Sequence, residues 1–128
     1  MTDSPLSQPP VPNGPDFTNI DSQEKAEAGF LRGELEKLLL FPAEFGGTDD
    51  PHNVVYVPLG FAGIKSDIDR NIVRPLADQG KISRYEARPE YQDRSFIPMA
   101  INIVASGSGS FTTTINIWGK ALERRGDV

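Results

Sequence analysis

The chain has no cysteine, one histidine and no apolar run long enough to cross a bilayer, which takes about 18 consecutive apolar residues. Without cysteine it forms neither disulfides nor thiolate zinc sites, and nothing in its composition points to an oxidising compartment. Its N-terminus is polar and proline-rich and lacks the basic start and apolar core of a signal peptide. We therefore expect a cytoplasmic protein with no membrane partner.

Basic residues are also fewer than acidic residues, 13 against 18, which gives a net charge of −5. Contacts to phosphate dominate nucleic-acid affinity, so an acidic chain of this size is a poor candidate for direct nucleic-acid binding. The charge favours a basic protein partner instead. At 128 residues and 38% apolar composition, the chain has room for one domain with a single core.

The beginning of the chain differs in composition from the rest. Five prolines alternate with small polar residues before residue 16, a composition that buries too little apolar surface to fold. We predict a disordered leader over residues 1–18, a single domain over 19–119 and a short tail over 120–128. A proline-rich recognition motif is the alternative for the leader, but such short patterns arise readily by chance.

A first helix is predicted from Asp21, which has Glu24 three residues on, the spacing of a capping box. Apolar residues follow at intervals of three and four as far as Leu39, and Pro42 ends the pattern. Residues 38–41 fit the end of this helix and also a short strand, so the pattern leaves both open.

The most distinctive stretch of the sequence is Phe45-Gly46-Gly47, followed by an acidic turn over residues 48–53 and an apolar strand over residues 54–58. A segment with helical spacing then runs from Ile64 to Gln79, with Ser66 as its expected cap and Pro75 as a predicted break. Further on, residues 82–91, 97–104 and 111–118 alternate between apolar and polar positions, as antiparallel strands do. The predicted fold class is α+β: an N-terminal helix, a ββα-like unit and a three-stranded antiparallel meander.

This order of loop, strand and helix resembles the non-specific DNA/RNA endonucleases of the ββα-metal, or His-Me finger, class. These nucleases are common as toxin domains in bacterial polymorphic toxin systems. The residues that carry the resemblance are Phe45-Gly46-Gly47, Asp50, Asn53 and Val57-Pro58. The resemblance covers roughly residues 38–118 and implies a hairpin followed by a helix.

Two positions depart from the pattern of that class. The catalytic histidine should fall near Leu39, and the asparagine that holds the metal should fall near Ile64. Leucine takes no proton from water, and isoleucine offers a cation no oxygen. The resemblance therefore implies a degenerate member, to which we assign no catalytic residue, no metal and no cofactor.

His52 lies beside Asp49 and Asp50, which raises the question of a metal site or a relocated catalytic group. Aspartates in such a turn more often bond nearby backbone groups, and three residues within four loop positions match no known ligand geometry. We favour the backbone-capping interpretation.

Three functions remain open. The first is a catalytically inactive nuclease-like domain that acts by protein binding, as an immunity protein or inhibitor of a bacterial nuclease toxin, with a partner-binding surface that includes Glu34, Glu36, Asp49 and Asp50. The second is an active metal-dependent endonuclease with relocated groups. The third is a structural or assembly protein of a secretion or phage-like particle. We prefer the first because the acidic charge suits a basic nuclease surface.

Overall fold

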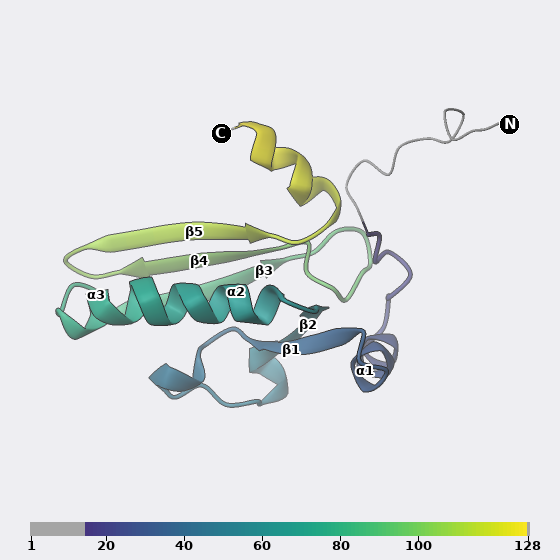
Figure 1. Ribbon diagram of the computed structural model, residues 1–128, viewed down its shortest axis with the longest axis horizontal. Helices are drawn as coiled ribbons and strands as arrows, with labels where there is room; N and C mark the ends of the chain where they lie inside the picture. The colour runs from purple at the N-terminus through teal and green to yellow at the C-terminus, as the bar shows by residue number, and fades with distance from the viewer. Residues whose placement is uncertain (1–14, 128) are drawn as a thin grey trace, which may run out of the picture.

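The computed structural model describes residues 15–127, which form two antiparallel sheets with a helical run between them (Figure 1). The elements in chain order are α1 (Gln23–Leu31), β1 (Leu35–Leu39), the 3-10 turns η2 (Ala43–Phe45) and η3 (Pro51–Asn53), β2 (Val54–Pro58), α2 (Phe61–Ile68), the π-helical turn η4 (Asp69–Val73), α3 (Arg74–Asp78), β3 (Arg84–Glu90), β4 (Ala100–Ser106), β5 (Ser110–Asn116) and the 3-10 segment η5 (Gly119–Asp127). The α+β prediction is confirmed.

Helix α1 is shorter than the apolar spacing predicted. Its N-cap is Ser22, whose hydroxyl oxygen accepts the backbone N–H of Lys25, while the Asp21 carboxylate bonds the Lys25 ammonium instead. The chain leaves the helix at Gly33, which has a φ of +78° that favours glycine. The prediction of a helix as far as Leu39 is therefore wrong, and the question over residues 38–41 is answered in favour of a strand that ends at Leu39.

Strands β1 and β2 form a two-stranded antiparallel sheet in which Leu35 pairs with Pro58 and Leu39 with Val54. One face of this hairpin meets α1, where Gly29 lies so close to Leu35 that a Cβ on the glycine would come within 2.7 Å of the leucine side chain. Residues of α1, β1 and β2 share the larger core with β4 and the segment after β5. The hairpin is thus packed into the centre of the molecule.

The helical run begins earlier than predicted, at Phe61, so Ser66 lies within α2 and does not cap it. The cap comes from another element: the carboxylate of Glu36 on β1 accepts the backbone N–H groups of Gly60 and Ala62 at 2.8 and 3.1 Å. The helical run is not divided at Pro75: it continues from α2 through the π-helical turn η4 into α3, and Val73 and Arg74, which precede the proline, keep right-handed helical conformations.

The predicted meander is confirmed as the sheet β3-β4-β5, in which each strand pairs antiparallel with the next. Along β3, Tyr85 and Ala87 face the interior while Arg84, Glu86 and Arg88 are exposed, as the alternation predicted. No helix in the described part of the chain has the length and apolar character that a membrane span requires.

Both ends of the described chain contact the core. Residues 1–14 of the predicted leader lie outside the described residues, whereas Phe17 packs edge-on against the Trp118 ring with centroids 5.7 Å apart. In the segment predicted as a tail, η5 contains Ala121, which is completely buried, and Arg124, which pairs with Glu90 on β3.

Candidate functional site

The Phe-Gly-Gly stretch lies in a loop that we call the roof loop, residues 41–47. Its conformation depends on Asn53, whose side-chain amide donates to the backbone oxygens of Phe41 and Thr48 at 2.9 and 2.8 Å, while its oxygen accepts the Phe41 N–H at 2.7 Å. Gly46 has a φ of +101°, and Gly47 lies against the Phe41 carbonyl, where a Cβ would clash at 1.8 Å. Backbone geometry thus explains why Gly46, Gly47 and Asn53 occupy their positions in the stretch that resembles the nucleases.

Beneath the roof loop lies a buried polar cluster of Lys65, Asp69 and Tyr85. The Lys65 ammonium donates to Asp69 Oδ2 at 2.7 Å and to the Tyr85 hydroxyl at 2.8 Å, and that hydroxyl donates to Asp69 Oδ1 at 2.7 Å. The Lys65 and Asp69 side chains are only 2% and 3% exposed. The cluster therefore closes a three-membered ring of hydrogen bonds and joins the helical run to β3.

Burial dominates the electrostatics of this cluster. Loss of solvent lowers the pKa of Lys65, and the neighbouring Asp69 carboxylate opposes that shift. Burial also raises the pKa of Tyr85, and its hydrogen bond to Asp69 adds to the increase. The phenol therefore stays protonated as a donor, and a lone charge at either Lys65 or Asp69 would be strongly unfavourable.

Aromatic rings close the cluster on the β3 side. The rings of Phe41 and Phe45 lie 6.1 Å apart, and each has its centroid 5.8 Å from that of Tyr85. A hollow of about 200 Å³ borders these rings. The remaining lining residues of this hollow are Ala77, Ile82, Ser83 and Arg84.

A second hollow, of about 190 Å³, lies on the other side of the roof loop, between the end of β1 and α2. Lys65 and Asp69 line it from the helix, Leu39 from the strand, and Glu44 from the roof loop. Glu44 also faces Arg70, with Oε2 3.8 Å from the guanidinium Nε. This hollow is the candidate functional site, because charged and apolar side chains converge on it from three elements.

The two positions at which the chain departs from the nuclease pattern occupy different places relative to this hollow. Leu39 lines it, whereas Ile64 is 47% exposed on the outer surface of α2. The neighbouring helix residue Lys65 faces the hollow in place of Ile64. An ammonium already bonded to a carboxylate thus occupies the helix side of the site.

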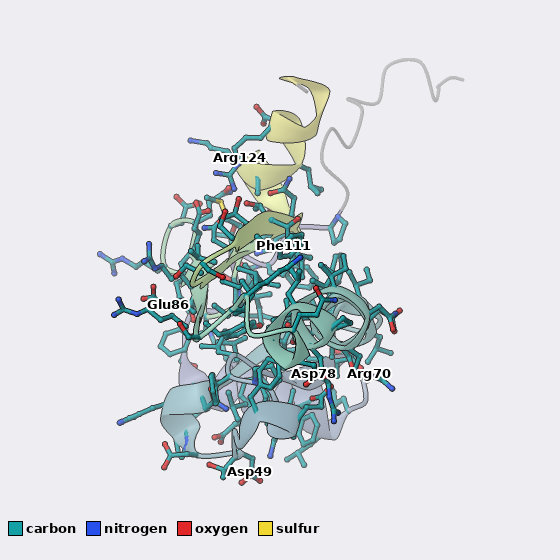
Figure 2. All side chains as sticks on the ribbon, turned by 90° about the vertical axis from the view of Figure 1, so that its left-hand side faces the viewer. Asp49, Arg70, Asp78, Glu86, Phe111 and Arg124 are labelled. Carbon is teal, nitrogen blue, oxygen red and sulfur yellow. The ribbon has the colours of Figure 1, made fainter. Side chains whose placement is uncertain are left out.

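In the acidic turn, the Asp50 side chain caps the backbone, as we favoured. The Asp50 carboxylate accepts the His52 backbone N–H at 2.9 Å and begins η3, while the His52 ring nitrogen Nδ1 stays 4.0 Å from it. Figure 2 shows Asp49 at the outer end of this loop, directed into solvent. Within residues 15–127, no group of three or more histidine, aspartate or glutamate side chains is placed to hold a metal ion.

The four predicted partner-binding residues do not form one patch. Glu34 precedes β1 and pairs with Arg32 at 3.1 Å, and Glu36 caps α2. Asp49 and Asp50 precede β2, at the opposite end of the hairpin. Glu34 lies just before the five-residue strand β1, whose length of about 17 Å separates it from the end near Asp49 and Asp50, and Glu36 is the second residue of that strand.

None of the three members of the buried cluster was predicted from the sequence as a site residue. Lys65 and Asp69 fall in the segment predicted as a helix, and Tyr85 falls in a predicted strand. The available signal was the four-residue spacing of a lysine and an aspartate, Lys65 and Asp69, on the side of the helix that also carries Val73. A lysine and an aspartate four residues apart can pair on one helix face, and pairing is the condition under which such charges are buried.

Comparison with known proteins gave no match to this chain among protein-family models, curated proteins or solved structures.

Proposed function

We propose that this chain is a catalytically inactive nuclease-like domain that acts by binding another protein, as an immunity protein or inhibitor of a bacterial nuclease toxin. The resemblance to the ββα-metal nucleases supplies the nuclease context. The residues that line the hollow beside Lys65 supply the argument against cleavage chemistry.

The observation that carries the proposal is the identity of the groups that face each other across this hollow. In the resembled class, a histidine on the first strand faces a cation held from the helix. Here the strand presents Leu39, and the helix presents the ammonium of Lys65 already bonded to Asp69. Leu39 has no lone pair and so is no general base. The buried carboxylate of Asp69 is already paired with the ammonium of Lys65.

The distribution of charge supports a basic protein partner. Residues 15–60 contain nine acidic and three basic side chains, a net charge of −6, whereas residues 61–127 contain eight acidic and ten basic side chains, a net charge of +2. The acidic half comprises α1, the hairpin and both 3-10 turns. Such a surface attracts a protein that uses positive potential to bind nucleic acid, and it accelerates their encounter.

The test is a titration of the chain against purified bacterial nuclease toxin domains whose genes neighbour the gene for this chain in its genome, with inhibition of DNA or RNA cleavage as the readout. A double variant Glu34→Lys, Asp49→Lys removes acid from the proposed surface. Glu36 and Asp50 are left unchanged because their carboxylates cap α2 and η3. The matched control makes the same charge change in the other half, at Asp78 and Glu86.

We expect the acidic-half variant to bind at least about tenfold more weakly, with a slower association rate and a weaker salt dependence, and the control to change less. Equal losses in both variants would remove the acidic-surface mechanism. Failure of the unmodified chain to bind or inhibit the nuclease would overturn the proposal itself.

A further inference from the structure

A third hollow, of about 240 Å³, lies in the loop that joins β3 to β4, where Tyr91, Ser95 and Phe96 line it. Its walls are mainly apolar. The two rings keep much of their surface in solvent, with exposed fractions of 45% for Tyr91 and 42% for Phe96. Part-exposed aromatic rings around an apolar hollow are typical of a site that binds another segment of chain.

Hydrogen bonds fix the loop around this hollow. The Ser95 hydroxyl accepts the backbone N–H of Ile97 at 3.0 Å and donates to the Phe17 carbonyl at 2.8 Å. The Phe96 N–H donates to the Ile20 carbonyl at 2.7 Å. The loop therefore holds both rings at the surface before a ligand arrives, which reduces the entropy lost on binding.

The same hydrogen bonds bring the beginning of the described chain to the hollow. Phe17 and Ile20 are bonded to the residues that line it, and Figure 1 shows the described chain starting beside the loop between β3 and β4. Pro12 is five residues before Phe17, so at most about 18 Å of chain separates the proline from this anchor. Residues before position 15 can thus reach the hollow without any change in the described part of the chain.

The sequence before residue 15 has a period that suits an aromatic hollow. Leu6, Pro9, Pro12 and Pro15 recur every three residues. The polyproline II helix has three residues per turn, so side chains at this spacing share one face, and aromatic-lined grooves are a common binding site for such segments. A short proline pattern arises readily by chance, but this one is tethered beside a hollow that matches it.

We propose that the hollow between Tyr91 and Phe96 binds residues 9–12 of the same chain as a polyproline II helix, with Pro9 and Pro12 against the rings. The predicted leader buries too little to fold alone, but a polyproline II helix needs no internal hydrogen bonds and gains its contacts from the domain. Residues 4–15 carry no charge, so no charged side chain loses solvent on docking. The proposal is independent of the proposed inhibitor function.

Tethering favours the segment of the same chain over a proline-rich segment of another protein. A short connection gives the tethered segment an effective concentration on the order of 1 mM. If its intrinsic Kd is on the order of 100 µM, the segment occupies the hollow about ten times more often than it leaves the hollow empty. A free peptide has to compete with this segment, so its apparent affinity for the intact chain falls about tenfold.

The test uses a synthetic peptide with the sequence of residues 4–14, titrated into the full chain while the amide NMR signals of the loop between β3 and β4 are followed. The double variant Pro9→Ala, Pro12→Ala removes the prolines that face the rings and should bind the free peptide about tenfold more tightly than the unmodified chain, because the hollow is vacated. The matched control Pro5→Ala, Pro10→Ala removes two prolines outside the three-residue row and should leave the affinity nearly unchanged. Equal affinity in the unmodified chain and in Pro9→Ala, Pro12→Ala would overturn the proposal, since the hollow would then take prolines only from another molecule.

A second pair of variants tests whether the rings form the site. In the Pro9→Ala, Pro12→Ala background, Phe96→Ala should weaken peptide binding by at least about tenfold. Phe41→Ala, at a ring that is similarly exposed (40%) but lies in the roof loop, is the matched control and should leave binding unchanged. Circular dichroism melts check that both variants are folded. Equal losses in the two ring variants, or no change in the signals of the loop in any chain, would contradict a proline site in this hollow.

Discussion

Two short segments with charged residues, the turn Thr48–Asn53 and the helix segment Lys65–Asp69, have opposite environments in this molecule. The turn gathers two aspartates and the only histidine of the sequence, yet His52 is 90% exposed and its ring nitrogen Nδ1 comes no closer than 4.0 Å to the Asp50 carboxylate. The helix segment has an ordinary lysine and aspartate, yet both are almost fully buried and hydrogen-bonded. Burial, more than residue type, decides which charges are energetically important.

The largest expected effect comes from breaking the buried pair. Lys65→Met should reduce the free energy of unfolding by about 3–5 kcal/mol, because the Asp69 carboxylate is left buried without a counter-charge. Urea denaturation measures the change, and His52→Ala, in the exposed turn, should stay within about 0.5 kcal/mol of the unmodified chain.

The double variant Lys65→Met, Asp69→Leu sharpens the same comparison. Replacing both charges with apolar groups removes the uncompensated carboxylate, so most of the lost stability should return. A double variant as unstable as Lys65→Met would show that the cluster contributes through something other than paired charge.

The fold was largely predictable from local patterns, since the period-two alternation along β3, β4 and β5 depends on neighbouring residues. The buried cluster beside the candidate site was not, because Tyr85 is 16 residues from Asp69 and 20 residues from Lys65, across the helix–sheet contact. The predicted length of the first helix was wrong for a related reason. Leu35 and Leu38 fit helical spacing, but Gly33 ends the helix and both leucines enter the core from a strand. Tertiary contacts override spacing at such points.

The next largest effect is expected at Asn53, whose side chain holds the roof loop by hydrogen bonds. Asn53→Ala removes three hydrogen bonds and leaves the Phe41 N–H without an acceptor, so the free energy of unfolding should fall by about 2 kcal/mol. Amide hydrogen exchange of Phe41 should accelerate in parallel. Asp49→Ala, four residues earlier and directed into solvent, is the control, and a similar loss of stability there would contradict the assigned role of Asn53.

A smaller effect is expected at Tyr85. Tyr85→Phe keeps the ring contacts to Phe41 and Phe45 and removes only the hydroxyl, which accepts from Lys65 and donates to Asp69. The expected loss is about 1–2 kcal/mol by thermal or urea unfolding. Tyr91→Phe, at a tyrosine that is 45% exposed, should change stability by less than about 0.5 kcal/mol.

The smallest effect is expected at Glu90, whose side chain is partly exposed and is thus intermediate in solvent access between the buried Lys65–Asp69 pair and the exposed turn. The hydrogen bond from Asn102 lowers the pKa of Glu90, and Arg124 adds to the shift. A carboxylate with a lowered folded-state pKa stabilises the fold above its unfolded value of 4.5, and this contribution is lost as the pH falls through the lowered pKa. Glu90→Gln should therefore flatten the decline of stability below about pH 4.5. An unchanged slope would exclude this contribution.

We propose that the hollow beside Lys65 keeps a nuclease-like setting without nuclease chemistry. The most direct measurement is cleavage of plasmid DNA and total RNA by the purified chain in Mg²⁺ or Mn²⁺, with an EDTA control. We predict no cleavage beyond that of a mock purification. Cleavage that EDTA abolishes, and that the triple variant Asp49→Ala, Asp50→Ala, His52→Ala loses, would contradict the claim and make the acidic turn the active site.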